Sequence, residues 1–139
     1  MAEITASAWD EFLSRRPDAH LLQSSAWGAL KDGFGWPPVR LLAGETGAQV
    51  LFRRLPLGFS VGYLPKGPLG EDWSALLPEL DRACRRQRAV FLRVEPDAWE
   101  EDALEVAARL PGFRPSKPVQ PQRTIILSLD GSEEQWLER

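Results

Sequence analysis

The sequence predicts an α/β domain in which helices flank a mixed sheet. Three strand-like runs follow one another closely, at 39–43, 49–55 and 59–64, and short turn sequences separate them. Apolar residues at helical spacing occur both before and after these runs. A further run, 89–94, is almost continuously apolar, which is typical of a strand covered on both faces. These patterns indicate a meander of strands, joined through a helix to a central strand.

Length and composition fit one folded domain. The 139 residues can bury a single core, and 43% apolar with 27% charged residues is ordinary for a folded soluble chain. A net charge of -3 argues against a protein whose whole surface binds nucleic acid. Cys84 and His20 are single residues of their types, so neither an intrachain disulfide nor a Cys/His zinc site is possible. We expect one domain over residues 1–139, without metal or cofactor.

No segment of the sequence is predicted to enter or cross a membrane. The first twenty residues lack the apolar core of a signal peptide. No later stretch approaches the roughly 18 uncharged apolar residues of a membrane span. We therefore expect a cytoplasmic protein with no integral membrane segment.

Two helices are predicted ahead of the strands. The first covers Ala8–Arg15 and ends before Pro17. The second begins at Ser24 or Ser25, either of which can cap it, and carries Lys31 on the flank of its apolar stripe. The apolar stripes consist of Trp9, Phe12 and Leu13 in the first helix and of Trp27, Leu30 and Phe34 in the second.

The second half of the chain is predicted to contain further helices and strands. Helical spacing extends over 72–88, and the run 89–94 follows it as the central strand. Asp97 is expected to cap the next helix, and 123–129 is predicted to be a strand. A capping box at Ser132 opens a last helix of about two turns before the sequence stops. The apolar stripe expected after Asp97 comprises Trp99, Ala103, Val106, Ala107 and Leu110.

Common catalytic and phosphate-binding motifs are missing from the sequence. Neither GxSxG nor a local Cys/His signature occurs, and the single histidine lies in a predicted loop, so a hydrolase triad is disfavoured. The patterns GxxxxGK(S/T) and GxGxxG are absent as well. The glycine pairs are therefore interpreted as turns.

Three residues are candidates for a functional site. Glu95 follows the apolar run and precedes Pro96, which favours extended geometry at the strand end. A carboxylate in a cleft there could act as a general base, although an exposed acid in a turn is the simpler interpretation. Lys31 and Lys66, the latter in the turn YLPKGP, could each bind an anion or could be ordinary solvated lysines. The arginines of 82–88 are interpreted as a solvated helix end, and the tryptophans mainly as core.

Five short motifs occur in a fixed order, namely LQSSAWGALKDGFGW, YLPKGP, FLRVEPD, the pair GF at 112–113, and VQPQRTIILSL. Together they resemble the first half of the Fem-type peptidoglycan aminoacyltransferases, over roughly residues 20–139. Members of this family transfer an amino acid from aminoacyl-tRNA to the stem peptide of a cell-wall precursor. Their chains resemble two tandem acetyltransferase-like domains. The resemblance implies a GNAT-like fold, with residues 1–139 as the N-terminal half of a longer chain.

The resemblance also implies roles for individual residues. Lys31 matches the family lysine that contacts the precursor diphosphate, and Glu95 matches an acid proposed as the catalytic base. Trp36, which closes the first motif, and Lys66 are taken as further substrate-binding residues. The implied partners are a nucleotide- or lipid-linked muropeptide and, through the second half of the chain, aminoacyl-tRNA. A lipid-linked acceptor would place the protein at the inner face of the membrane.

Two other functions stay open at this point. The chain could be a free-standing acyl-CoA-dependent N-acyltransferase, which would need a splayed strand pair to admit pantetheine. The glycine-rich phosphate loop of acetyl-CoA enzymes is missing from it. It could instead be a non-catalytic module that binds the precursor or a protein partner. Because the last predicted helix is so short, we expect the sequence to stop within an element and residues 1–139 alone to be inactive.

Overall fold

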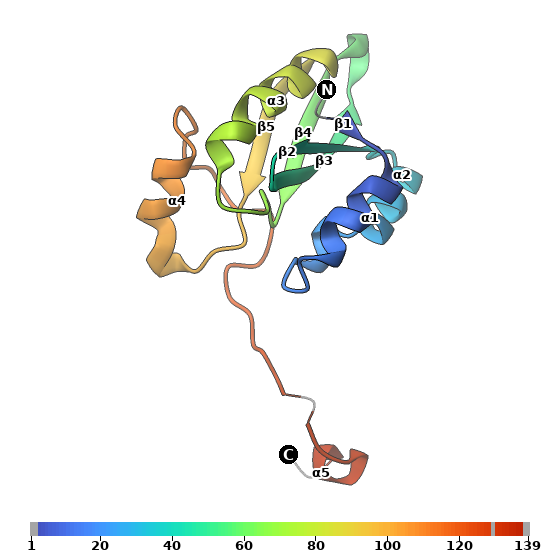
Figure 1. The fold of residues 1–139 in the computed structure, drawn as a ribbon, viewed down its shortest axis with the longest axis vertical. Coiled ribbons are helices and arrows are strands. Elements are labelled where there is room, and N and C mark those ends of the chain that lie inside the picture. The colour runs from blue at the N-terminus through green and yellow to red at the C-terminus, as the bar shows by residue number, and fades with distance from the viewer. Residues whose placement is uncertain (1–2, 129, 138–139) are drawn as a thin grey trace.

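Five strands form one mixed sheet at the centre of the molecule, with helices against both of its faces (Figure 1). The computed structural model describes residues 3–128 and 130–137. Strands β1 to β4 are antiparallel neighbours, and β5 lies parallel to β4. The predicted fold class, a mixed sheet flanked by helices, is confirmed. In both chain order and spatial order the strands are β1 (Glu3–Ile4), β2 (Pro38–Ala43), β3 (Thr46–Arg54), β4 (Ser60–Pro65) and β5 (Ala89–Glu95).

Helices and short helical turns connect the strands. The longest helix links β4 to β5, because parallel neighbours need a crossover rather than a tight turn. None of the described helices is long and apolar enough to span a bilayer. In chain order they are α1 (Ala6–Ser14), η1 (Leu21–Gln23), α2 (Ser25–Gly33), η2 (Pro56–Gly58), α3 (Trp73–Arg86), η3 (Glu100–Asp102), α4 (Ala103–Arg109) and α5 (Glu133–Leu137).

Helix α3 packs on one face of the sheet and closes the main core. Its residues Leu76, Leu80 and Ala83 are buried together with Val50 and Phe52 of β3. Successive side chains of a strand point to opposite faces, so alternate residues of β3 all face α3. The intervening residues of β3 face the other side of the sheet, where α2 lies.

Helix α2 is held on that opposite face by a buried glutamine. The side-chain amide of Gln23 donates to the carbonyl oxygens of Gln49 (3.2 Å) and Pro65 (2.6 Å). Its side-chain oxygen accepts the backbone N–H of Gln49 (2.8 Å). The Gln49 side chain in turn donates to the carbonyl of Ser24, the N-cap of α2 (2.9 Å). These hydrogen bonds fix α2, and with it Lys31, relative to β3 and β4.

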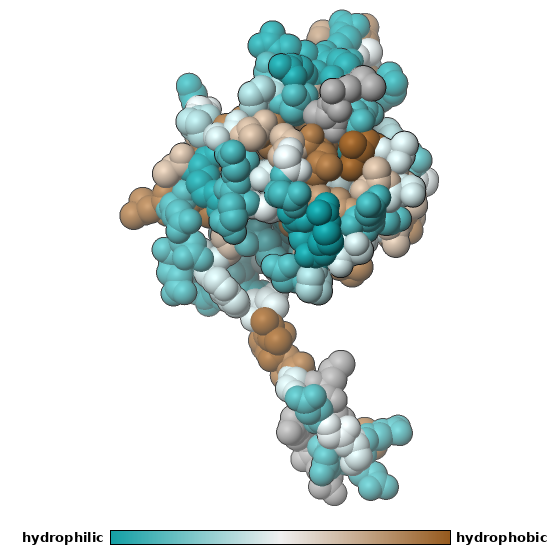
Figure 2. Space-filling model, in the orientation of Figure 1, coloured by the Kyte–Doolittle hydropathy of each residue, from teal (hydrophilic) through white to brown (hydrophobic). Residues whose placement is uncertain are grey.

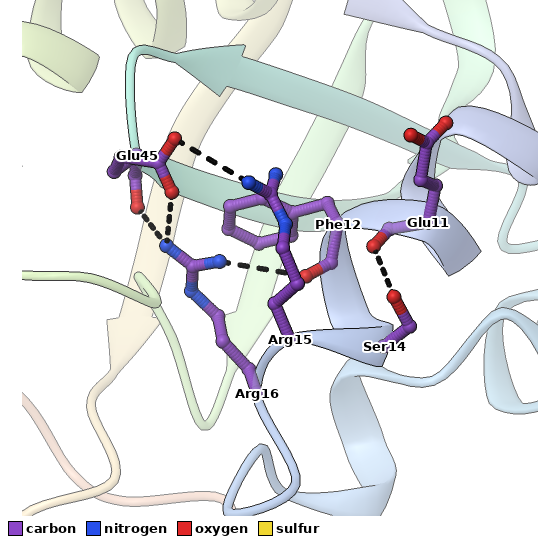
Figure 3. A network of polar contacts seen from close by, with 6 residues as sticks. All are labelled: Glu11, Phe12, Ser14, Arg15, Arg16 and Glu45. Carbon is purple, nitrogen blue, oxygen red and sulfur yellow. Dashed lines mark hydrogen bonds and ion pairs between the residues drawn. The ribbon is translucent and has the colours of Figure 1, made fainter.

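The C-terminal end of α1 is fastened to the turn between β2 and β3 (Figure 3). The Arg16 guanidinium carbon lies 3.9 Å from the ring centroid of Phe12. Arg16 also donates to the backbone and carboxylate oxygens of Glu45, with 3.3 Å to Oε2. Arg15 forms a second ion pair with Glu45 at 3.7 Å. The positive charges of Arg15 and Arg16 are therefore already engaged within the fold.

The prediction that 89–94 forms a central strand is wrong for the described part of the chain. Strand β5 lies at an edge of the sheet, and Val90 and Phe91 are 56% and 52% exposed. Leu92 and Val94 of the same strand pack against the α3 core. A continuous apolar run shows that both alternate sets of side chains are apolar. It does not show whether the second face is covered, because the covering element lies elsewhere in the sequence.

The strand predicted at 123–129 is also not observed. Residues 123–128 have no regular secondary structure, and Leu129 lies outside the described residues. Ile125 and Ile126 are 86% and 79% exposed. Figure 2 shows this apolar stretch as the brown part of the chain that leaves the body of the molecule. A sequence with high strand propensity forms a strand only beside a partner strand, and none lies next to it among the described residues.

Two predicted apolar stripes are less buried than expected. After β5, Asp97 does not cap a helix: its carboxylate pairs with Lys66 at 3.3 Å, and α4 starts only after η3. Trp99, expected on the buried side of that helix, is 70% exposed. In α2, Leu30 and Phe34 are 52% and 72% exposed. The face of α2 that meets the sheet is therefore narrow.

Candidate functional site

Beyond α2, the described residues cover the sheet face that carries this helix only in part over β4 and β5, and we call this partly exposed region the open face. Helix α2 packs on β2 and β3. Strand pairing joins Leu51 to Tyr63 and Tyr63 to Arg93, so these side chains share the α2 face. Tyr63 and Arg93 are half-buried, and Phe91, on the same face of β5, is 52% exposed. Candidate site residues lie at the two ends of this open face.

At one end, two cations gather around one tryptophan. Lys31, in the last turn of α2, places Nζ 5.6 Å from the ring centroid of Trp27 and 5.8 Å from that of Trp36. Arg53, near the end of β3, places its guanidinium carbon 5.7 Å from the Trp36 centroid. The fold thus brings together Lys31 and Trp36, both predicted from the sequence, and adds Arg53. We call Lys31, Trp36 and Arg53 the cation cluster.

Neither cation of the cation cluster forms an ion pair with an acid of the described residues. Among residues 3–128 and 130–137, no carboxylate oxygen lies within 4.0 Å of Lys31 Nζ or of the Arg53 guanidinium. The charge of Asp32, the next residue along α2, acts on Arg40, where burial lowers the pKa of the guanidinium and Asp32 opposes that shift. Two unpaired cations held beside an aromatic ring are suited to bind an anion such as a phosphoryl group.

At the other end of the open face, Glu95 closes β5 and holds the chain that returns after α4. Its Oε1 accepts the backbone N–H of Val119 (2.5 Å), and its Oε2 accepts that of Gln120 (2.9 Å). The Gln120 side chain donates to the Tyr63 hydroxyl (3.1 Å). Burial raises the pKa of Tyr63, and the negative charge of Glu95 adds to this, while Gln120 and Arg93 act in the opposite direction. We call Glu95, Tyr63 and Gln120 the carboxylate cluster.

The carboxylate cluster is compatible with two roles for Glu95. Each carboxylate oxygen accepts one backbone N–H and retains a further lone pair. The side chain therefore anchors residues 119–120 and can still accept a hydrogen bond or a proton from a ligand. Both interpretations drawn from the sequence, a general base and a structural acid, are consistent with this geometry.

The two clusters lie far enough apart to define an extended site. Arg53 is paired with Val61, and Glu95 with Pro65, so four residues of β4 separate the two positions, about 13 Å at about 3.3 Å per residue. Two strand spacings, about 10 Å, separate β3 from β5. The cation cluster and the carboxylate cluster are therefore on the order of 16 Å apart. A ligand that contacts both must be elongated.

Lys66 is not part of either cluster. Its backbone N–H donates to the Glu95 carbonyl (2.6 Å), but its side chain lines a separate cavity of about 830 Å³ and pairs there with Asp97. The other guanidinium groups that line this cavity are engaged as well: Arg15 and Arg16 with Glu45, and Arg109 with the carbonyls of Gly70 and Glu71. A role for Lys66 in substrate binding thus stays a prediction to which the geometry adds nothing.

The cysteine and the acidic residues of the described chain form no competing site. Burial raises the pKa of Cys84 to about 11, so its thiol is protonated and unreactive near neutral pH. Within residues 3–128 and 130–137, no three His, Cys, Asp or Glu side chains are grouped so that they could hold a metal ion.

Strands β4 and β5 remain paired up to their C-terminal ends. Tyr63 pairs with Arg93 and Pro65 with Glu95, and the Lys66 N–H continues the ladder one residue further. A pantetheine arm would need the strands to part at this position. The splayed pair expected of an acyl-CoA-dependent enzyme is therefore missing from the described residues.

These features define an acetyltransferase-like domain with an unpaired cation cluster and a strand-end carboxylate on one open sheet face. The model of the FemAB family matches residues 4–117, most of the chain, and the chain belongs to the FemAB family. The family resemblance inferred from the ordered motifs is confirmed.

Individual relatives agree with this assignment. The chain is 29% identical to the lipid II:glycine glycyltransferase of Staphylococcus haemolyticus and 28% identical to that of Staphylococcus aureus. These matches cover 95% and 96% of this chain but only 36% and 37% of the relatives, so the chain spans little more than a third of their length. The crystal structure of FemX matches with a TM-score of 0.63 and 28% identity, over 79% of this chain and 31% of that one.

Sequence reasoning missed three residues of the two clusters, Arg53, Tyr63 and Gln120. Alternation along the strand from Gln49 would have placed Arg53 on the same face as Leu51. Alternation shows which face of the sheet Arg53 occupies. It does not show its neighbours Lys31 and Trp36, which come from α2 and from the segment that leads into β2. Tyr63 opens the motif YLPKGP, in which Lys66 attracted attention because of its charge.

Proposed function

We propose that residues 1–139 form the precursor-binding half of an aminoacyltransferase, which moves an amino acid from aminoacyl-tRNA to the stem peptide of a peptidoglycan precursor. The observation that carries the proposal is the pairing, on one open sheet face, of an unpaired cation cluster with a carboxylate about 16 Å away. A precursor of this kind is elongated, with a diphosphate near one end and an amine on its stem peptide.

The domain organisation belongs to the same proposal. Residues 1–139 form one acetyltransferase-like domain of a longer two-domain chain, and the second domain completes the site and receives the aminoacyl-tRNA. The relatives support this, since the chain matches little more than a third of their length. Residues 1–139 alone would then present one wall of the site.

In the proposed mechanism, the chain positions the acceptor and helps to remove its proton. Lys31 binds the diphosphate, which orients the stem peptide along the sheet face towards Glu95. The stem-peptide amine attacks the aminoacyl ester, so that a C–N bond forms and the C–O bond to the tRNA ribose breaks. Glu95, or a water molecule that it orients, accepts the amine proton, and the departing ribose oxygen takes up a proton to become a hydroxyl, so no covalent enzyme intermediate is needed.

The names of the relatives suggest the first substrates to test. Both glycyltransferases are named for lipid II and glycine. We therefore propose glycyl-tRNA as donor and a lipid-linked muropeptide as the first acceptor, with its nucleotide-linked counterpart as the alternative. A lipid-linked acceptor requires the protein to work at the inner face of the membrane.

The first prediction tests Lys31 in the full-length protein. Lys31→Ala should weaken binding of the precursor by about 1.5–3 kcal/mol, the range for a hydrogen bond to a charged group, with little change in thermal stability. Calorimetric titration with nucleotide-linked muropeptide measures the affinity, and a glycyl-tRNA assay measures transfer. Lys117→Ala, an exposed lysine beyond α4, is the matched control. Unchanged affinity in Lys31→Ala would refute the assigned role.

A further inference from the structure

We infer that Arg53 and Lys31 bind the same diphosphate group, and that Trp36 positions both cations for it. This inference rests on the proposed function, since it names further residues that hold the diphosphate of the precursor. It adds a binding residue, Arg53, and changes the expected role of Trp36 from contacting the substrate to ordering its neighbours.

The convergence of three separate elements on one ring carries the inference. Lys31 comes from the end of α2, Arg53 from the end of β3, and Trp36 from the segment that leads into β2. Both cations lie within 6 Å of the Trp36 centroid, the range in which the ring attracts positive charge. Arg53 thus has a defined position although its side chain is exposed.

The cation cluster carries two positive charges beside one aromatic ring. Lys31 Nζ and the Arg53 guanidinium carbon lie 5.8 and 5.7 Å from the same ring centroid, so their like charges are at most about 12 Å apart and repel each other. No carboxylate oxygen of the described residues lies within 4.0 Å of either one. An anion that contacts both Lys31 and Arg53 removes this repulsion. Other arginines of the described chain, such as Arg82 and Arg85, are paired with acids on their own helix.

The two side chains complement each other in the chemistry of phosphate recognition. Lys31 supplies a compact point charge, and Arg53 supplies a planar fork that can donate two parallel hydrogen bonds to phosphoryl oxygens. A diphosphate offers two adjacent phosphoryl groups, one for each cation. The same group occurs in a nucleoside diphosphate and in a polyprenyl diphosphate, so the inference concerns the shared diphosphate.

Trp36 acts through its neighbours. Its ring is half-buried and has both cations near it, which restricts their rotamers before the anion arrives. Trp36→Leu should therefore weaken diphosphate binding, and Trp36→Phe, which keeps an aromatic face, should restore most of the affinity. A purely structural role would instead lower the thermal midpoint of both variants without this difference in affinity.

Calorimetric titration of the full-length protein with UDP-linked muropeptide tests Arg53 directly. Arg53→Gln should weaken binding about 10- to 100-fold, whereas the neighbouring exposed Arg54→Gln, whose side chain alternates to the other sheet face, should change it less than about twofold. Arg53→Lys keeps a positive charge but not the planar guanidinium, so its affinity should lie between those of the wild type and Arg53→Gln. Equal affinity of wild type and Arg53→Gln would overturn the inference.

A double-mutant cycle tests whether one anion is shared. If Lys31 and Arg53 bind the same diphosphate, the loss in the double variant Lys31→Gln/Arg53→Gln should differ clearly from the product of the single losses. Strictly multiplicative losses would mean two independent sites, which contradicts the inference.

Three ligands show which molecule supplies the diphosphate, and a transfer assay distinguishes failure of this inference from failure of the proposed function. The first two ligands are UDP-linked muropeptide and the same muropeptide on a polyprenyl diphosphate in phosphatidylcholine vesicles. Arg53→Gln should bind both more weakly than the wild type. If only one of them binds more weakly, that ligand is the source of the diphosphate. Muropeptide without diphosphate should bind wild type and Arg53→Gln equally. A loss of its affinity as well would overturn the inference. Arg53-dependent diphosphate binding without aminoacyl transfer would contradict the proposed function and leave the inference standing.

Discussion

At the scale of single residues, Glu95 combines a structural contact with the position that we propose for the general base. Its carboxylate accepts the N–H groups of Val119 and Gln120, and its neighbour Tyr63 is half-buried on the same face. A side chain in such a network is held in one orientation, as a general base must be. The same hydrogen bonds also tie the chain after α4 to the end of β5. Glutamine removes the charge and keeps the shape but replaces one of the two accepting oxygens by an NH2 group, so the rate and the stability must be measured together to separate these contributions.

We predict that Glu95→Gln lowers turnover in the full-length enzyme by about 10²- to 10⁴-fold, the range that general-base catalysis supplies. Precursor affinity should stay near that of the wild type, because the cation cluster is untouched. Single-turnover rates and the thermal midpoint are measured on one preparation, with the exposed Glu101→Gln as control. A normal rate per folded molecule together with a lower midpoint would leave Glu95 with the structural role alone.

At the scale of elements, the position of α2 depends on a polar contact in the protein interior. Gln23 is fully buried and joins η1 to the backbone of β3 and to the end of β4. Polar groups at such sites are tolerated because every hydrogen bond is made. Since Ser24, the N-cap of α2, directly follows Gln23, the same contact sets where Lys31 meets Trp36.

Gln23→Met should therefore destabilise the fold and disturb the site together. Methionine fills a similar volume but removes the Gln23 hydrogen bonds to three backbone groups, the C=O and N–H of Gln49 and the C=O of Pro65. At about 1–3 kcal/mol for each buried group, we expect a loss of at least about 3 kcal/mol. Urea denaturation measures the free energy of unfolding. The exposed Gln122→Met is the control and should change it by less than about 0.5 kcal/mol. A loss no larger than that of the control would show that the network contributes nothing.

At the scale of the whole molecule, the core and the C-terminal segment differ in how deeply their apolar side chains are buried. The buried residues of the main cluster lie between Val39 and Ala83, whereas Ile125, Ile126 and Leu127 are 86%, 79% and 70% exposed. An exposed apolar stretch of this sort buries little surface and so contributes little to the stability of the described domain. Folding and activity should consequently respond differently to chain length.

We expect residues 1–139 to unfold in one cooperative transition but to catalyse no aminoacyl transfer. Removing residues 123–139 should leave the thermal midpoint within about 2 °C, because the described side chains of 123–128 are exposed. Calorimetry of both lengths and a glycyl-tRNA assay beside the full-length protein provide the measurements. Efficient transfer by residues 1–139 alone would show that the site is misplaced, and a large drop of the midpoint would contradict the account of the core.

Local patterns in the sequence determined much of the fold. The spacing of Trp9 and Phe12 predicted α1, strand-like runs between turn sequences predicted β2 to β4, and the stripe of Leu76 and Leu80 predicted α3, each within a few residues of the observed bounds. Ordered motifs also indicated the family, together with Lys31, Trp36 and Glu95 as candidates. Such signals depend on the geometry of a single helix or strand, which a short stretch of sequence specifies by itself.

Tertiary structure alone decided which residues meet. Arg53 joins Lys31 at Trp36 because α2, β3 and the segment that leads into β2 converge there, and residues 119–120 reach Glu95 only because the chain returns after α4. The edge position of β5 and the exposure of 123–128 likewise depend on which elements lie beside them. Contacts between residues distant in sequence are set by register and packing, and periodicity within one element carries no information about its neighbours.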